Sequence, residues 1–212
     1  TDESKLSWSI CRVCRYVSIR DNLFINEIIN LSMTKIINLF GGPCSGKSTI
    51  SSGLFYELKR RNISCDNPYE FPKQVAWEKN DSQINDQLFI FANQHRGIVR
   101  SYGKVDYIIV DSPILLSLAY KNGYESGYPS TLYNDTFDKM VLDVFNKYEN
   151  INIFLDRPDN FQDEGRLQNH KESLDFDNKI KSIMDKNEIS YRTLKVNDKT
   201  IEYILTFTLG LQ

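Results

Sequence analysis

This 212-residue sequence has only two histidines, no long apolar run and no strong net charge. Each of these features excludes a class of protein. No apolar run approaches the roughly 20 residues that a membrane-spanning helix needs, and no secretory signal pattern is present. The formal net charge of −2 argues against a large basic face for duplex nucleic acid. We therefore expect a cytoplasmic protein with no membrane partner, for which nucleic acid is a disfavoured partner.

Patterns for metal clusters and disulfides are also missing. The only two histidines, His95 and His170, have no cysteine, histidine or carboxylate at ligand spacing. Cys11 and Cys14 form a single CxxC, and no second pair completes a zinc site. The other two cysteines show no disulfide pattern. We interpret Cys11 and Cys14 as incidental thiols in a reducing compartment.

The chain length suits one domain with an appendage. Residues 1–32 read as an irregular or weakly helical N-terminal extension, and Met33 is where we expect the folded domain, residues 33–212, to begin. The alternative is a genuine N-terminal helix at residues 21–31 that packs on the domain. No internal repeat or low-complexity linker divides the remainder.

From residue 35 onward, short apolar runs alternate with helical patterns. We expect five strands, at residues 35–40, 63–66, 105–110, 151–155 and 191–196. We expect six helices, at residues 47–61, 83–102, 114–121, 131–148, 175–186 and 199–208. Strands that alternate with helices form a parallel sheet covered on both faces. The sequence therefore predicts an α/β fold of three layers around a five-stranded parallel sheet.

The segment GGPCSGKST, residues 41–49, carries the strongest signal. It satisfies the pattern G-x-x-x-x-G-K-[ST] between a predicted strand and a predicted helix, which is the context that this phosphate-binding loop (P-loop) requires. Its glycines let backbone N–H groups point at phosphate oxygens, next to the positive end of a helix. We expect the nucleotide ATP to be bound by Gly41, Gly42, Pro43, Cys44, Ser45, Gly46, Lys47, Ser48 and Thr49.

Three P-loop residues have specific expected roles. The ammonium of Lys47 should reach the β- and γ-phosphates, and the hydroxyl of Ser48 should bind Mg²⁺. The hydroxyl of Thr49 can contact the α-phosphate or cap the following helix. Asp111 ends the apolar run at residues 105–110, where a P-loop protein needs an acid for the metal. We expect Asp111 to bind Mg²⁺ through water or to accept from Ser48, although it could merely cap the next helix.

The rest of the chain favours a kinase over a switch or a motor. A signalling GTPase usually carries N-K-x-D after a later strand, whereas Asp156-Arg157-Pro158 follows the run at residues 151–155. Glu70 follows the second predicted strand. In an open parallel sheet this is the ligand-binding edge, where a carboxylate can accept a proton from an attacking hydroxyl. The alternative for Glu70 is a solvated loop residue.

Several side chains could shape the pocket for a second substrate. The predicted helix at residues 83–102 carries Gln87 and Gln94, which can pair with a nucleobase edge, and Arg96, which could neutralise phosphate; a polar surface explains them equally well. Specificity could also come from Phe71, Trp77, Phe91 and the tyrosine-rich segment at residues 120–133. That segment could instead form a contact in a homodimer.

Residues 156–171 mix arginines with Gly165 and several acids. A loop of this composition can close over the transferred phosphoryl group, exclude water and place an arginine on the transition state. We expect Arg166 to be catalytic, with Arg157 in support on the nucleotide. The alternative is a surface loop of mixed charge.

The runs EFPKQVAWEK, VDYIIVDSPILLSLAY and FLDRPDNFQDEGRLQ, with the P-loop, resemble a group of bacteriophage-type P-loop proteins described as AAA-type ATPases. That group is similar to nicotinamide riboside kinases and deoxynucleoside or nucleotide kinases, and the resemblance spans residues 35–196. It implies a strand order of 2-3-1-4-5, with Glu70, Asp111, Arg157 and Arg166 in the positions of the family's acids and lid arginines, and host cytoplasm as the location of a viral protein. Asp111-Ser112-Pro113 departs from the Glu-Arg-Ser type of sequence of deoxynucleoside kinases.

The sequence thus predicts an Mg²⁺- and ATP-dependent phosphotransferase that acts on a nucleoside, a nucleotide or a similar small molecule. Two alternatives stay open. One is a kinase that acts on a modified base or an end of DNA. The other is an ATP-binding regulatory or anti-defence protein without kinase activity.

Overall fold

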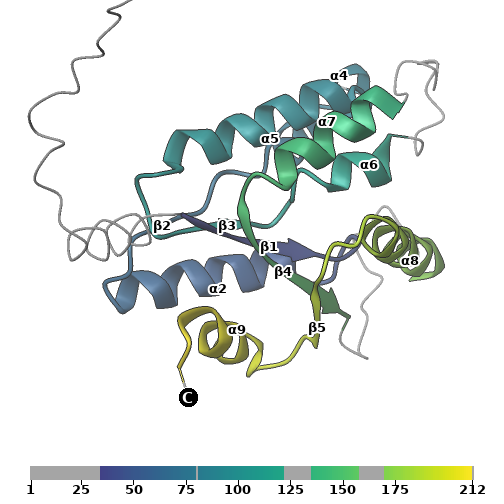
Figure 1. Ribbon diagram of the computed structural model, residues 1–212. Coiled ribbons are helices and arrows are strands. Elements are labelled where there is room, and N and C mark those ends of the chain that lie inside the picture. The colour runs from purple at the N-terminus through teal and green to yellow at the C-terminus, as the bar shows by residue number, and fades with distance from the viewer. Residues whose placement is uncertain (1–33, 80, 122–134, 158–169, 212) are drawn as a thin grey trace, which may run out of the picture. The chain divides into compact units, whose positions relative to one another are not determined.

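In the computed structural model, a parallel sheet of five strands organises the described part of the chain, which comprises residues 34–79, 81–121, 135–157 and 170–211 (Figure 1). The strands are β1 (Lys35–Phe40), β2 (Cys65–Asp66), β3 (Tyr107–Val110), β4 (Glu149–Asp156) and β5 (Arg192–Lys195). Their order, β2-β3-β1-β4-β5, confirms the predicted class and topology. The predictions for residues 1–32 lie outside the described residues.

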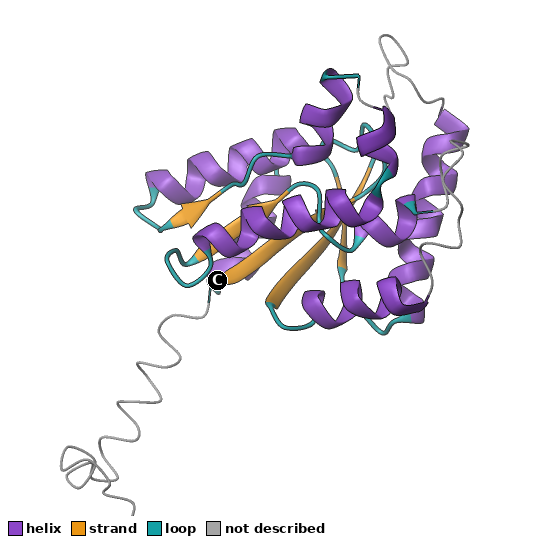
Figure 2. Cartoon of the chain, turned by 90° about the horizontal axis from the view of Figure 1, so that it is seen from above, coloured by secondary structure: helices purple, strands orange, loops and turns teal. Residues whose placement is uncertain are grey.

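The sheet is apolar on both sides because helices cover both of its faces. Helices α5 (Gln87–Ser101), α6 (Leu116–Tyr120), α7 (Asp135–Phe145) and α8 (His170–Lys186) supply buried residues to one face. Helices α2 (Lys47–Arg60) and α9 (Thr200–Leu209) supply them to the other. Figure 1 shows the resulting three layers, and Figure 2, seen from above, shows the strands fanned by the usual sheet twist.

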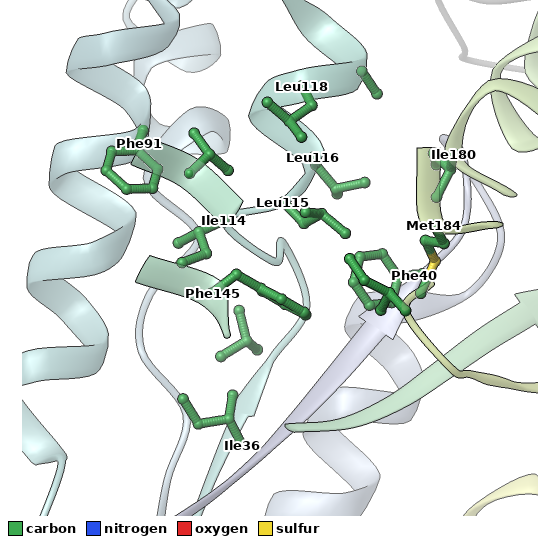
Figure 3. Packing of buried hydrophobic residues seen from close by; sticks show 14 of the residues in the cluster. Ile36, Phe40, Phe91, Ile114, Leu115, Leu116, Leu118, Phe145, Ile180 and Met184 are labelled. Carbon is green, nitrogen blue, oxygen red and sulfur yellow. The ribbon is translucent and has the colours of Figure 1, made fainter. Parts of the chain in front are cut away.

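Side chains of β1, the central strand, alternate between the two cores. Ile37 and Leu39 pack with α2 and α9, whereas Ile36 and Phe40 pack with the helices of the opposite face. In Figure 3, Phe40 lies near Phe145 of α7 and Met184 of α8. This burial fixes the end of β1, from which the P-loop starts.

One polar residue interrupts the apolar face of β1. Asn38 is buried, and its Nδ2 donates to Oδ1 of Asn150 at 2.8 Å and to Oδ1 of Asn152 at 3.0 Å on β4. A buried amide without partners would be costly, so these side-chain bonds let a polar residue occupy the centre of the sheet.

The structure differs from the predicted elements mainly between β2 and β3. The single helix expected at residues 83–102 is divided into α4 (Asp81–Asn85) and α5, because Asp86 caps α5 by accepting from the backbone N–H of Phe89 at 3.0 Å. A short helix that the sequence analysis missed, α3 (Phe71–Trp77), begins with proline in its first turn, a position that proline tolerates. Among the described helices, none is both long and apolar enough to cross a membrane.

Candidate active site

The P-loop, Gly41–Ser48, connects β1 to α2, as the pattern predicts. Two of its glycines are required by geometry. Gly41 has φ +141°, and a Cβ there would lie 2.5 Å from Oγ of Ser45; Gly46 has φ +85° and precedes the first residue of α2. A residue with a side chain would be strained in both places. The loop therefore presents backbone N–H groups next to the start of a helix, an anion-binding arrangement.

The Lys47 side chain rests on the loop itself. Its Nζ donates to the backbone carbonyls of Gly41 and Gly42, each at 2.8 Å. Burial lowers the pKa of Lys47, and the nearby carboxylates of Glu70, Asp111 and Asp177 act in the opposite direction. Those acids partly compensate a positive charge that a bound phosphate would compensate more fully.

Ser48 and Asp111 lie near one another at the site. Burial raises the pKa of Asp111, while the neighbouring Ser48 hydroxyl and the charge of Lys47 act to lower it. A hydroxyl and a carboxylate beside a phosphate site are oxygen ligands that suit Mg²⁺, which usually takes a few protein oxygens together with water and phosphate. The residues present therefore fit the metal that the P-loop pattern implies.

Glu70 lies between β2 and α3, at the same edge of the sheet. It is partly buried, and burial raises the pKa of its carboxyl; the neighbouring Asp111 carboxylate raises it further. The charges of Lys47 and Lys73 act in the opposite direction. Two acids and one lysine that follow three different strands thus share one electrostatic neighbourhood, which is the condition for proton transfer next to a phosphate.

Glu70 also lies where two hollows meet. The first, the P-loop cleft, is lined on one side by loop residues and the start of α2 and on the other by α3 and α6: Pro43, Cys44, Gly46, Lys47, Ser48, Thr49, Glu70, Pro72, Lys73, Ala76, Ser112, Leu116 and Tyr120. The second, here named the glutamine cavity, has a volume of about 110 Å³ and is lined by Glu70, Pro72, Ile84, Gln87, Ile90, Gln94, Ser112, Leu116, Ser117 and Tyr120. It is smaller than typical small-ligand sites, which measure roughly 300–1,000 Å³.

The two glutamines of the glutamine cavity are held in fixed orientations. Nε2 of Gln94 donates to the backbone carbonyl of Ser112 at 3.0 Å and to its Oγ at 2.7 Å, and Nε2 of Gln87 donates to the carbonyl of Ile84 at 3.0 Å. Since a carbonyl can only accept, each amide nitrogen must face it. The two Oε1 atoms are buried and have no hydrogen-bond partner among the described residues.

Other side chains proposed for the second substrate lie elsewhere. Trp77 is 74% exposed, Phe91 is buried in the core, and Phe71 packs edge-on against Phe89 with ring centroids 5.4 Å apart. None of these three lines the glutamine cavity, and neither does Arg96, which is exposed.

Tyr120 does line the cavity, whereas residues 122–134 of the tyrosine-rich segment lie outside the described residues. Arg166 also lies outside them. Arg157 is described, and its guanidinium forms a buried ion pair with Asp177 of α8, with Nε 3.0 Å from Oδ2. Sequence reasoning missed Asp177, because one acid within a helix rich in charge carries no signal, and it missed Ser112, the partner of Gln94.

Solved structures with the same fold are nucleoside and nucleotide kinases. Two structures of deoxyadenosine kinase from M. mycoides, one with dCMP and dCDP bound and one with dATP, match with TM-scores of 0.53 and 0.50 at 16% and 15% identity. Each match covers 82% of this chain and 99% of the kinase. Thymidylate kinase from Ehrlichia chaffeensis matches with a TM-score of 0.52 at 18% identity, over 84% of this chain and 100% of that one. These likenesses show a P-loop kinase fold.

No curated protein matches the sequence significantly. A family model does: the AAA_28 model, described as an AAA domain, matches residues 36–202. That range contains the P-loop, Glu70, Asp111 and most of the sheet and its helices. With this match over most of its length and with the P-loop kinase fold, the chain belongs to the AAA_28 family of AAA domains.

Proposed function

We propose that this protein is an Mg²⁺- and ATP-dependent kinase that transfers a phosphoryl group to a nucleoside, a nucleotide or a similar small acceptor. The observation that carries the proposal is the position of Glu70, which lines both the P-loop cleft and the glutamine cavity. A carboxylate at the junction of two such hollows lies between a donor bound in one and an acceptor bound in the other.

On the donor side, the N–H groups of the P-loop and of the first turn of α2 bind the phosphates of ATP. Lys47, which rests on Gly41 and Gly42, turns to the β- and γ-phosphates. Ser48 and Asp111 would hold Mg²⁺, which when bound neutralises charge on the phosphate oxygens. Binding a phosphate also supplies Lys47 with a stronger partner than the loop carbonyls, so the ATP-bound arrangement favours its charged form.

On the acceptor side, Ile84, Ile90 and Leu116 give the glutamine cavity apolar walls suited to a flat ring. The Oε1 atoms of Gln87 and Gln94 are buried and have no partner among the described residues; turned toward the cavity, they would accept hydrogen bonds from N–H groups at the edge of a nucleobase. Glu70 then accepts the proton of the attacking hydroxyl, or orients an attacking phosphate. Its raised pKa makes its carboxylate a better base than that of an ordinary glutamate.

The remaining parts of the account stay predictions from the sequence. Arg166, supported by Arg157, is proposed to neutralise the transferred group, so Arg166→Ala should reduce transfer strongly and leave ATP binding largely intact. We also retain as proposals the similarity to nicotinamide riboside kinases and to bacteriophage proteins, the cytoplasmic location and a homodimer.

The experiment that tests the proposal is incubation of the protein with γ-³²P-labelled ATP, MgCl₂ and a panel of acceptors. The panel contains nucleosides, nucleoside monophosphates and oligonucleotides, and the products are separated by chromatography. Label in a small acceptor supports the proposal. Label found only on oligonucleotides would instead favour a kinase that acts on DNA ends or bases. If neither phosphoryl transfer nor acceptor-stimulated ATP hydrolysis is detected, both kinase hypotheses are refuted.

A further inference from the structure

A buried ion pair joins the P-loop to helix α8, and it gives Arg157 a task besides the support of Arg166 proposed above. Arg157 follows β4, and Asp177 lies in α8; their side chains are only 5% and 10% exposed. Nε of Arg157 donates to Oδ2 of Asp177 at 3.0 Å, and Nη2 of Arg157 donates to the backbone carbonyl of Ser173 at 2.9 Å. The arginine is therefore fixed by two contacts on one helix.

The second oxygen of the same carboxylate binds the P-loop. Oδ1 of Asp177 accepts a hydrogen bond from the backbone N–H of Gly42, 135 residues away in the sequence. The packing here is close: a Cβ added to Gly42 would lie 2.6 Å from Nη2 of Arg157, 2.8 Å from Oδ1 of Asp177 and 3.1 Å from the carbonyl of Ser173. The first turn of the P-loop is thus held against α8 at a glycine with no room for a side chain.

We propose that Asp177 and Arg157 are positioning residues that hold the P-loop in the shape that binds the phosphates of ATP. The inference rests on ATP binding, one part of the proposed function, and is independent of the acceptor. Asp177 supplies the hydrogen-bond acceptor for Gly42, and Arg157 supplies the charge that makes a buried carboxylate tolerable. The pair adds no net charge beside the phosphate site.

Single substitutions would mix two effects. Removing Arg157 alone would leave the negative charge of Asp177 near bound phosphates without its ion-pair partner, and removing Asp177 alone would take away the acid that balances the charge of Arg157. Both charges influence Lys47, in opposite directions. A clean comparison therefore removes both charges in each variant and changes only the acceptor that faces Gly42.

Two double variants meet this condition. In R157M/D177N the side-chain amide oxygen can still accept from the Gly42 N–H, whereas in R157M/D177M no acceptor is left. Binding is measured by fluorescence titration with mant-ATP and MgCl₂, and folding by thermal unfolding. We expect R157M/D177M to bind mant-ATP about tenfold more weakly than R157M/D177N, because a buried N–H has lost its partner.

Gly42→Ala supplies a second test in case the double variants do not fold, because its Cβ would push the ion pair away from the loop. Its control is Gly53→Ala in α2, where the added Cβ would meet only the Cδ1 end of the flexible Ile201 side chain at 2.3 Å. We expect weaker mant-ATP binding for Gly42→Ala and unchanged binding for Gly53→Ala.

The outcomes separate the two proposals. Equal binding by the two double variants, or full binding by Gly42→Ala, would overturn the positioning role while the proposed kinase function stood. Failure of the wild type to bind mant-ATP would overturn both. A difference between the double variants with equal melting temperatures would support the positioning role, since a purely structural pair would change stability and binding together.

Discussion

Replacing Glu70 by glutamine tests the chemistry of the site while preserving its shape. A positioned general base contributes roughly 10²- to 10⁴-fold to a rate, or about 2.7–5.5 kcal/mol in the barrier. Glu70 is partly buried where the two hollows meet, and its side chain accepts no capping hydrogen bond from α3, so Glu70→Gln should lose the base and little else. We expect kcat to fall by roughly 10²- to 10⁴-fold and the KM for ATP to stay within about threefold.

The control for this variant is Glu78→Gln, which changes an exposed glutamate at the other end of the same short helix, where Glu78 accepts from Gln74 at 3.4 Å. Its kcat should equal that of the wild type. Both variants are assayed by steady-state transfer of label from ATP to the best acceptor of the panel. Full activity of Glu70→Gln would refute the assignment of Glu70 as the base.

The melting temperature of Glu70→Gln shows whether a loss of activity comes from lost catalysis or from lost folding. Because the fold raises the pKa of Glu70 above its ordinary value of 4.5, its charged form disfavours the folded state. Stability is therefore lost as pH rises from about the ordinary value through the raised one, and glutamine avoids that loss. Glu70→Gln should melt at or above the wild-type temperature at pH 7, and the difference should disappear below the ordinary pKa. A lower melting temperature at pH 7 would argue against this electrostatic picture.

Three further variants test separate parts of the site. Gln94→Leu removes a buried oxygen that can accept a hydrogen bond in the glutamine cavity. In two-substrate kinetics, kcat/KM for the phosphoryl acceptor should fall about tenfold while the KM for ATP stays unchanged. Equal losses for both substrates would contradict this. Lys73→Met removes a charge that lowers the pKa of Glu70, so the acidic limb of the kcat/KM profile should move to higher pH; an unmoved limb would count against Glu70 as the titrating base. Gly46→Ala and Gly103→Ala both place a side chain at positive φ, +85° and +74°, at a cost of about 1–2 kcal/mol each. Both should lower the melting temperature, and only Gly46→Ala should weaken mant-ATP binding; weaker binding by both would mean that the effect is not local to the P-loop.

The sequence predicts secondary structure best where consecutive residues of a strand are buried. Residues 35–40 were predicted as a strand and form β1 with those bounds, because most residues of a central parallel strand are apolar. The region between β2 and β3 was predicted less well. The turn at Asp86 and the short helix α3 depend on a cap and on proline at a helix start, and such local signals are weak within a polar stretch.

Only part of the candidate site, likewise, could be predicted from the sequence. The positions of Lys47, Ser48 and Asp111 follow from a loop pattern and from the end of a strand, so the sequence alone could predict their meeting. The Asp177 hydrogen bond to Gly42 could not be predicted, because it joins residues 135 positions apart and depends on how α8 packs on the sheet. Cavity walls depend on packing too, which is why Gln87 was identified correctly as a cavity residue while Trp77 was not.

The central claim is that ATP is consumed in order to phosphorylate an acceptor. The most direct test measures, in one reaction, the ADP formed and the acceptor phosphorylated, with the best acceptor of the panel and in its absence. The account predicts one ADP for each acceptor phosphorylated and little ADP without acceptor. ADP formation at the same rate with and without acceptor, with no label transferred, would contradict it.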